Sequence, residues 1–593
     1  MTEGGGAGIN RVTWRDLVSA VPAVAADLPV IARALRTGLV PWPGAKMSLA
    51  TVFQDRAAQH GDRVFLRFGE QELTYAQANA RANQYAAVFA ARGVKRGDVV
   101  AVMLRNSPET VLVMIAAVKC GAVAGMLNYH QREEALAHSL TLLNASVMVA
   151  DADLIGAVVE CGGPTGDVLS IADLGVLADR APAANPAAAA EVLAKDPAFY
   201  IFTSGTTGLP KASVMTHRRW LAALAGFGGF GLRLKGSDTL YCCLPLYHNN
   251  ALTVALASVL VSGSTLAIGA SFSASRFWDE VIACRATAFI YIGELCRYLL
   301  NQPPKPTDRQ HHVRVIAGNG LRPDIWTEFT ERFGIKRVCE FYAASESNLG
   351  FVNVFNIPGT IGIFPLPLAY VEYDLETGYP LRFDDGRVRR VPPGRPGLLL
   401  SPVTKMQPFD GYTDAESTEK KLVRNAFRDG DAWFNTGDVL SPQGFGHAAF
   451  VDRLGDTFRW KGENVATTEV EAALGAHPAV QQCAVYGVEV PNTGGRAGMA
   501  AVVLSDGVTF DGESLAATVY EHLPVYALPL FIRLVESLEV TSTFKSRKVE
   551  LREQAYGPDV ADPLYVLDGR TKGYVPFYAS YPDEVAAGRR PGA

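Results

Sequence analysis

Apolar and polar residues follow each other along most of the chain in a pattern that predicts alternating strands and helices. Residues 99–104 form an apolar run of strand length, and residues 108–120 form an apolar stretch of helical length next to a glycine. Further runs of strand length occupy residues 63–68, 239–248, 264–268, 288–292, 313–317 and 337–342. Strands that alternate with helices are typical of parallel sheets covered by helices, so we predict a large α/β domain of mainly parallel sheets.

The pattern changes twice in the second half of the chain. From about residue 360 the strands are shorter and are separated by proline and glycine, which indicates a β-rich subdomain. Beyond it, helices at 468–475 and 512–522 with strands at 482–486 and 500–504 indicate a small α+β domain. A chain of 593 residues is too long for one domain. We predict an N-terminal segment at 1–45, a large domain at 46–453, a hinge at 454–456, and a small C-terminal domain with a tail at 457–593.

An amphipathic stretch lies within residues 14–45. Apolar residues at helical spacing are interrupted by two arginines, and a tryptophan follows. The residues are Leu28, Ile31, Arg33, Leu35, Arg36, Leu39 and Trp42. This pattern suits a helix in a membrane interface, and it equally suits a helix docked on the protein's own surface. We expect peripheral contact at most, because no apolar run reaches the roughly 18 residues of a spanning helix.

Composition and charge narrow the class of protein. A chain that is 48% hydrophobic and 19% charged is normal for a soluble globular enzyme, and a net charge of −5 gives no reason to expect nucleic acid. The eight cysteines are scattered and none lies in a C-x-x-C motif, so neither a zinc site nor a disulfide framework is expected. These features favour a cytoplasmic protein, with any membrane contact at the cytoplasmic face.

A loop rich in hydroxyls and glycines follows the apolar run 198–202. It consists of Thr203, Ser204, Gly205, Thr206, Thr207, Gly208, Leu209, Pro210 and Lys211. The glycines let the backbone approach an anion, the hydroxyls donate hydrogen bonds, and the lysine adds a mobile positive charge. The spacing G-x-x-G-x-x-K differs from the Walker A motif. We predict a polyphosphate-binding loop, with a flexible surface loop as the alternative.

The loop resembles the signature of the adenylate-forming (ANL) superfamily, and further motifs follow in that superfamily's order. They are an element ending at His248, the triplet Gly318-Asn319-Gly320, residues 341–346 and 436–438, the pair Asp452-Arg453, and a loop at Lys545. Residues 200–212, 456–470 and 562–568 resemble the branch of fatty-acid transport proteins (FATP) and very-long-chain acyl-CoA synthetases. The overall likeness is to mycobacterial FATP-type fatty acyl-CoA synthetases. In one departure, the usual Gly-Ala-Thr-Glu is Ala-Ala-Ser-Glu at 343–346, and Ser345 keeps the hydroxyl.

The resemblance implies the ANL fold, with a mobile C-terminal domain, and a reaction that uses ATP, Mg²⁺ and coenzyme A. A carboxylate attacks the α-phosphate of ATP, which gives acyl-adenylate and pyrophosphate. The thiol of coenzyme A then takes the acyl group and releases AMP. Rotation at a hinge near Gly455 would bring either Lys545 or the loop at Gly462 to the reacting groups.

Three catalytic residues are implied by the same motifs. Lys545 would stabilise charge between the carboxylate and the α-phosphate, with Lys548 as the runner-up. His248 would orient the fatty carboxylate, and Glu346 would hold Mg²⁺ with Thr203 beside it. The structural alternatives are a surface lysine, a buried structural histidine and a solvated surface carboxylate.

A larger set is implied in binding ATP and coenzyme A. Tyr342 would stack on adenine, Asp438 would accept hydrogen bonds from the ribose, and Arg453 would lie near ribose and phosphate. Ordinary core packing is the alternative for Tyr342. The complete set is Thr203, Ser204, Gly205, Thr206, Thr207, Gly208, Lys211, Gly318, Asn319, Gly320, Glu340, Phe341, Tyr342, Ala343, Ser345, Asp438, Arg453 and Gly462.

The sequence therefore predicts a long- or very-long-chain fatty acid–CoA ligase that depends on ATP and Mg²⁺. The apolar helix at 249–262 is a candidate wall for a fatty-acid tunnel, and plain helix packing is the alternative. Two other functions stay open: a fatty acyl-AMP ligase that serves a carrier protein, and a fatty-acid uptake protein coupled to activation. A homodimer is compatible with the sequence.

Overall fold

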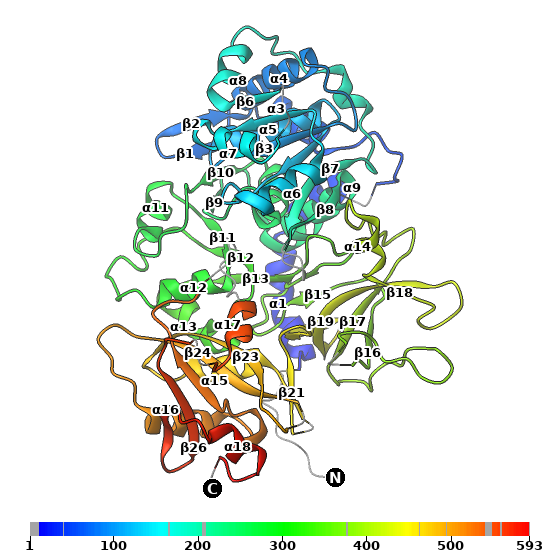
Figure 1. The fold of residues 1–593 in the computed structure, drawn as a ribbon. Coiled ribbons are helices and arrows are strands. Elements are labelled where there is room, and N and C mark those ends of the chain that lie inside the picture. The colour runs from blue at the N-terminus through cyan, green and yellow to red at the C-terminus, as the bar shows by residue number, and fades with distance from the viewer. Residues whose placement is uncertain are drawn as a thin grey trace.

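The computed structural model describes residues 11–38, 41–163, 167–203, 209–374, 377–461, 463–493, 495–539, 548–557 and 560–591. Figure 1 shows the N-terminal sheet and its helices at one end of the molecule and the C-terminal domain at the other. A long sheet lies between them and continues into the β-rich part of the chain. The predicted mixed α/β architecture is confirmed, with a large sheet-containing domain followed by a smaller one.

The longest sheet has 14 strands in the order β16-β17-β19-β20-β15-β14-β13-β12-β11-β9-β10-β1-β2, and β18 pairs with β19 beside this path. Its parallel part consists of β1 (Val64–Phe68), β9 (Thr239–Cys242), β10 (Thr265–Ile268), β11 (Ala288–Ile292), β12 (Val315–Asn319) and β13 (Arg337–Tyr342). Strand β2 (Gln71–Thr74) closes one edge in antiparallel pairing. The carboxyl ends of the parallel strands share one edge, which is where open α/β sheets place ligands.

The predicted β-rich subdomain is an antiparallel continuation of this sheet. Its strands are β14 (Phe351–Val352), β15 (Gly362–Ile363), β16 (Ala369–Val371), β17 (Gly397–Pro402), β18 (Leu422–Arg424), β19 (Ala432–Gly444) and β20 (His447–Arg453). Strand β13 pairs in parallel with β12 and antiparallel with β14, so it joins the two parts. Residues of both parts can therefore meet at one site.

A second sheet of six strands runs in the order β6-β5-β3-β4-β7-β8. The strands are β3 (Val99–Met103), β4 (Val123–Met126), β5 (Val147–Ala150), β6 (Val168–Ser170), β7 (Pro197–Thr203) and β8 (Lys211–Thr216). Only β8 is antiparallel to its neighbour. One cluster of buried side chains joins the two sheets through helices α3 (Leu49–His60), α4 (Tyr75–Ala91) and α5 (Pro108–Lys119). The surrounding helical elements are α6 (Glu133–Leu143), η1 (Ala152–Leu154), α7 (Ile155–Glu160), α8 (Ile171–Ala178), η2 (Ala187–Glu191), α9 (His217–Ala223), α11 (Phe277–Ala283), α12 (Gly293–Leu300), α13 (Pro323–Phe333) and α14 (Ala415–Glu419).

The C-terminal domain has its own buried core. Its sheet contains β23 (Val480–Glu489), β24 (Arg496–Leu504), β25 (Phe531–Leu534), β26 (Leu564–Gly569) and β27 (Gly573–Pro576). A hairpin of β21 (Phe458–Trp460) and β22 (Glu463–Val465) precedes it. The helical elements are α15 (Thr467–Gly475), α16 (Gly512–His522), η5 (Val525–Ala527), α17 (Lys548–Gln554) and α18 (Tyr581–Ala586).

Two π-helices depart from the predicted pattern. The glycine-rich segment η3 (Leu224–Leu232) was not predicted, and the expected helix at 249–262 begins as the π-helix η4 (Asn250–Ala255) before α10 (Leu256–Ser262). Glycine in η3 permits close packing, because a Cβ on Gly228 would lie 2.9 Å from the Cα of Ser258. The predicted strand at 239–248 is also wrong beyond Cys242, where a turn containing Pro245 leads to His248.

The N-terminal stretch forms helices α1 (Trp14–Ala26) and α2 (Leu28–Gly38). No single described helix is long and apolar enough to cross a membrane, although α1 and α2, which meet at a bend of 74°, together have the length and composition of a span. Helix α2 docks on the protein's own surface, since Ile31 and Ala34 are buried and Ala34 packs against Gly229 of η3. Helix α1 instead exposes Trp14, Val18 and Val21.

Candidate active site

Residues predicted to bind the nucleotide meet where the parallel and antiparallel parts of the long sheet join. Tyr342 ends β13, and its hydroxyl donates a hydrogen bond to Asp438 Oδ2 on β19 at 2.5 Å. Asp438 pairs in register with Arg453 on β20, and the Arg453 guanidinium lies 3.2 Å from Asp438 Oδ1. The buried Asp438 carboxylate thus links Tyr342, 96 positions before it in the sequence, with Arg453, 15 positions after it.

Charge and burial explain the ionisation of this cluster. The Asp438 carboxylate raises the pKa of Arg453 above its ordinary value, because it stabilises the cationic form. Burial and the same carboxylate raise the pKa of Tyr342 well above its usual range, so its hydroxyl stays protonated as a donor. The site therefore holds a fixed anion, a fixed cation and an aromatic ring.

Glu346 lies four residues beyond Tyr342, against the hydroxyl of Tyr412. Burial and the Glu346 carboxylate together raise the pKa of Tyr412 above its ordinary range. The backbone of Tyr412 also forms an isolated β-bridge with Ser213 of β8, and the centre of its ring lies 6.0 Å from Lys211 Nζ. Residues 411–413 thereby connect the Glu346 loop with the far end of the phosphate loop. Tyr412 was not predicted, because it lies in none of the motifs.

Arg219 is a second residue that the motifs did not identify. Its guanidinium donates to the carbonyl oxygens of Ser345 at 2.8 Å and Ser347 at 2.6 Å. Burial lowers the pKa of Arg219, and the nearby charges of Asp410 and Glu346 oppose that shift. Arg219 therefore fixes the backbone of the loop that carries Ser345 and Glu346.

The phosphate loop is anchored at both ends by strands. Thr203 ends β7 and Lys211 begins β8, and the two residues are partners in the ladder. The Thr203 hydroxyl donates to the Lys211 carbonyl at 3.5 Å. The predicted residues Ser204, Gly205, Thr206, Thr207 and Gly208 lie outside the described residues.

The triplet at the end of β12 is held from the neighbouring strand. The Glu340 carboxylate accepts the backbone N–H groups of Gly320 at 2.5 Å and Leu321 at 3.2 Å, and the Tyr291 hydroxyl donates to it. Burial raises the pKa of Glu340 to about 8. Gly318 has no room for a side chain, since a Cβ would lie 2.3 Å from the Tyr291 carbonyl oxygen. Glu340 thus shapes the triplet through its backbone.

Four other predicted residues lie around this cluster. Asn319 accepts a hydrogen bond from Asn250 at 2.9 Å, and Asn250 is two residues after His248. His248 itself is half-buried beside Tyr247, with ring centroids 4.5 Å apart. Phe341 is buried and packs on Phe227 of η3, whereas Ala343 is exposed.

Of the two candidate catalytic lysines, Lys548 is among the described residues and Lys545 is not. Lys545 lies outside the described residues, as does Gly462. Lys548 begins α17 and forms a largely buried ion pair with Glu471, with Nζ 2.8 Å from Oε1. Lys548 is therefore held inside the C-terminal domain.

The predicted hinge is a turn directly after β20. Gly455 sits in this turn, and nothing lies within 4 Å of a Cβ added there. The Asp452 carboxylate accepts the backbone N–H of Thr467 at 2.6 Å, and burial raises the pKa of Asp452 to about 6. Beyond the hinge, Arg322 of the large domain lies 4.0 Å from Glu471 of the C-terminal domain.

The donor set fits Mg²⁺ carried by a polyphosphate. The described residues contain no group of three or more His, Cys, Asp or Glu side chains that could hold a metal. Mg²⁺ at nucleotide sites commonly uses one or two carboxylates together with phosphate oxygens and water. The half-buried Glu346 carboxylate and the Thr203 hydroxyl fit that more limited requirement.

Comparison with known proteins shows the family to which this chain belongs. Residues 53–412 match the AMP-binding enzyme family and residues 469–545 match the AMP-binding enzyme C-terminal domain. The chain belongs to the AMP-binding enzyme family, which is the adenylate-forming superfamily that the motifs resemble. Within it, the chain belongs with the FATP-like branch.

Two relatives and two solved structures illustrate the match. The chain is 71% identical over 580 residues, 97% of each chain, to the medium/long-chain-fatty-acid–CoA ligase FadD6 of Mycobacterium tuberculosis. It is 40% identical to long-chain fatty acid transport protein 2 of Rattus norvegicus, covering 89% of this chain and 88% of that one. The fold resembles ATP-bound MatB from Rhodopseudomonas palustris (TM-score 0.73, 24% identity, 86% and 99% covered). It also resembles the anthranilate–CoA ligase AuaEII with anthranoyl-AMP (TM-score 0.74, 20% identity, 86% and 97% covered).

Proposed function

We propose that this chain is an ATP-dependent fatty acid–CoA ligase that forms an acyl-adenylate and then a thioester with coenzyme A. The observation that carries the proposal is 71% identity to a fatty-acid–CoA ligase across nearly the whole of both chains. The linked cluster of Tyr342, Asp438 and Arg453 supports it, because it offers the groups that a nucleotide needs.

The nucleotide would bind across the junction of β13, β19 and β20. The Tyr342 ring offers a face for adenine, and the carboxylate of Asp438 can accept hydrogen bonds from ribose hydroxyls while it holds Arg453. Lys211, at the far end of the phosphate loop, supplies a positive charge toward the leaving pyrophosphate.

Glu346 and Thr203 would hold Mg²⁺ on the phosphates, and the ion would neutralise charge that develops on the leaving group. Tyr412 and Arg219 position Glu346, one through its carboxylate and the other through the backbone of its loop. The carboxylate therefore has a fixed location before ATP binds.

The fatty carboxylate would meet His248, at the start of the helical segment formed by η4 and α10. This segment is almost wholly buried and mostly apolar, so it suits the wall of an acyl site. Each buried methylene of a ligand would contribute about 0.8 kcal/mol. The name of the 71% identical relative supports medium and long chains, and the resemblance to very-long-chain acyl-CoA synthetases favours long and very long ones.

Lys545 would act in the first half-reaction only. Its charge opposes the repulsion between carboxylate and α-phosphate, and this repulsion ends when pyrophosphate leaves. Rotation at Gly455 would then exchange Lys545 for the loop at Gly462, which would face coenzyme A. The open space around Gly455 supports this exchange.

A pyrophosphate-release assay over saturated fatty acids of graded length tests the proposal, run with and without coenzyme A. We expect release with medium or long chains and steady turnover only when coenzyme A is present. Turnover that requires an acyl carrier protein would favour the fatty acyl-AMP ligase. Specific fatty-acid binding without pyrophosphate release would favour an uptake protein.

Peripheral membrane contact is a separate proposal. Trp14, Val18 and Val21 share one exposed face of α1 at positions i, i+4 and i+7. Flotation with vesicles should decrease when Trp14 and Val18 are changed to serine. Equal flotation of this variant and the wild type would exclude α1 as the contact.

A further inference from the structure

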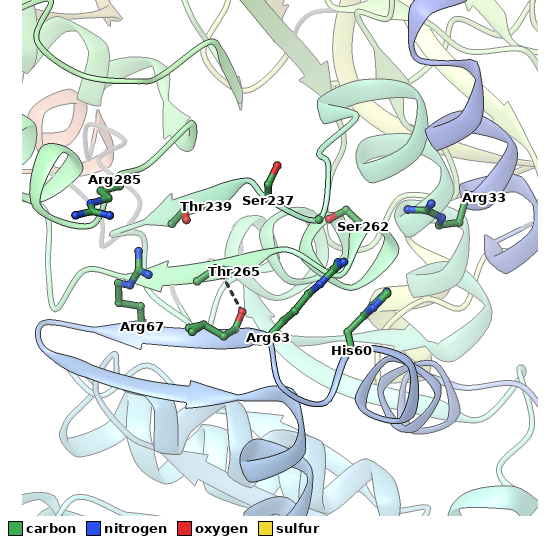
Figure 2. A pocket seen from close by; sticks show the side chains of 11 residues that line it. Arg33, His60, Arg63, Arg67, Ser237, Thr239, Ser262, Thr265 and Arg285 are labelled. Atoms are coloured by element: carbon green, nitrogen blue, oxygen red, sulfur yellow. Dashed lines mark hydrogen bonds between the residues drawn. The ribbon is translucent and has the colours of Figure 1, made fainter.

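A basic pocket of about 740 Å³ lies away from the candidate active site. Figure 2 shows its basic side chains in two groups, Arg67 of β1 with Arg285 before β11 on one side, and Arg63 before β1 with His60 and Arg33 of α2 on the other. The basic lining residues are Arg33, His60, Arg63, Arg67 and Arg285. No carboxylate is among the described residues that line it.

The pocket lies at the opposite end of the sheet from the nucleotide cluster. Thr239 and Thr265, which begin β9 and β10, line the pocket. His248 follows the carboxyl end of β9, and Asn319 and Tyr342 end β12 and β13. A molecule in the pocket would therefore occupy a site separate from the one proposed for ATP.

The arginines of the pocket are not alike. The Arg67 guanidinium is engaged within the protein, because it forms an ion pair with Glu72 at 2.7 Å and donates to the Cys284 carbonyl oxygen. Arg63 and Arg285 are exposed, and neither forms an ion pair with another described residue. Their two guanidinium groups keep their charge available for a ligand.

The pKa of His60 reflects the positive charges around it in the pocket. Burial lowers its pKa, and the charges of Arg63, Arg56 and Arg33 lower it further. The imidazole thus stays neutral near pH 7 and can donate or accept a hydrogen bond. A Cβ on Gly263 would lie 2.5 Å from the His60 ring, so the backbone packs directly against it.

The pocket also has hydroxyl groups and space next to the guanidinium of Arg63. Ser237 and Thr239 line it beside Gly236, where a Cβ would lie 2.3 Å from Arg63 Nη1. Thr265 is not available in the same way, because its hydroxyl donates to the Val64 carbonyl oxygen at 2.8 Å (Figure 2). Glycine at 236 therefore leaves room for the guanidinium inside the pocket.

We propose that this pocket binds phosphate groups, with Arg63 and Arg285 as the principal ligands on its two sides. Guanidinium groups match the geometry of phosphate and can donate two parallel hydrogen bonds, and hydroxyls complete such sites. An anion there would relieve the repulsion among clustered cations that no lining carboxylate offsets. The phosphate could belong to a small soluble molecule or to the headgroup of an anionic lipid.

The experiment uses the full-length protein and two probes. Calorimetry measures binding of inorganic phosphate, and co-sedimentation measures binding to phosphatidylglycerol vesicles, with phosphatidylcholine vesicles for comparison. The test variant is Arg63→Gln with Arg285→Gln, both at exposed positions, so it should keep the wild-type melting temperature. Arg395→Gln is the matched control, because Arg395 is an exposed arginine of the β-rich part.

We expect the wild type to bind at least one probe, and the double variant to bind that probe at least about tenfold more weakly. The control should differ from the wild type by less than about twofold. Phosphate binding would indicate a soluble ligand, and binding only to phosphatidylglycerol would indicate a lipid headgroup. The proposal is overturned if the wild type binds neither probe, or if the control loses as much as the double variant. It is also overturned if the double variant binds as the wild type does.

Discussion

Asp438 connects three strands through one side chain, since it accepts from Tyr342 and pairs with Arg453. Changing Asp438 to Asn keeps its shape and removes its charge. Hydrogen bonds to charged groups contribute roughly 1.5–3 kcal/mol, so KM for ATP should rise about 10- to 100-fold. Steady-state pyrophosphate release at varied ATP concentration measures this change.

Asp429→Asn is the control, because Asp429 is an exposed carboxylate that pairs with Arg387 on the surface. It should change KM by less than about twofold. A folded Asp438→Asn enzyme with wild-type KM would exclude this carboxylate from the nucleotide site.

Glu340 should give the protein a pH-dependent stability. Its pKa is raised from the ordinary value of 4.5 to about 8, so the folded protein holds a proton that the unfolded chain releases. This contribution is present below pH 4.5 and is lost as the pH rises toward 8. The loss reaches about 1.4 kcal/mol per pH unit, and the contribution is level above pH 8.

Glu340→Gln removes this dependence while keeping an acceptor for Gly320. The difference in melting temperature between wild type and variant should shift in favour of the variant from pH 5 to 8. It should then stay constant to pH 9. A difference that is constant over the whole range would contradict the buried, protonated state of Glu340.

Among single residues, sequence motifs could predict those that recur at a fixed spacing, but not those whose role depends on tertiary contacts. Tyr342, Asp438 and Arg453 were predicted, and the structure brings them together. Arg219 and Tyr412 were not, since an arginine in a helix and a tyrosine in a loop carry no local signal. Their contacts exist only after distant strands have paired.

At the scale of elements, the glycine-rich helix η3 provides a sharp test of packing. A Cβ on Gly229 would lie 2.1 Å from the Cβ of Ala34, which is buried in α2. Gly229→Ala should therefore destabilise the docking of α2 by about 1–3 kcal/mol and lower the melting temperature.

Gly226 offers a matched control in the same helix, because nothing lies within 4 Å of a Cβ added there. Gly226→Ala should leave the melting temperature unchanged or raise it slightly, since alanine favours helices by up to about 1 kcal/mol. Equal melting temperatures for the two variants would show that η3 and α2 do not pack as described.

The same helix shows why part of the fold could not be predicted. Strands β11 and β13 have the predicted bounds, because each is an apolar run bordered by polar or small residues. Segment η3 contains four glycines, which disfavour helix locally. Its helix is stabilised by close packing against α2 and α10, and this packing leaves no room for side chains at Gly228 and Gly229.

For the molecule as a whole, we predict that the two half-reactions need two orientations of the C-terminal domain. Gly455→Pro fixes φ in the turn that joins the domains. It should slow at least one half-reaction roughly 10-fold or more while ATP binding to the large domain is kept. Single-turnover assays of adenylation, and of thioester formation from supplied acyl-adenylate, measure the two steps.

Gly455→Ala is the control for this substitution, because its Cβ would meet no atom within 4 Å. It should keep both half-reactions near wild-type rates. If Gly455→Pro does so too, the hinge lies elsewhere in the chain.

We infer that each turnover activates one fatty acid by adenylation and transfers its acyl group to coenzyme A. The most direct measurement is a product balance with a saturated long-chain fatty acid, ATP, Mg²⁺ and coenzyme A, with all products quantified by mass spectrometry. We expect acyl-CoA, AMP and pyrophosphate in equal amounts, and bound acyl-adenylate when coenzyme A is left out. Formation of ADP and phosphate, or of AMP without any acyl-CoA, would contradict it.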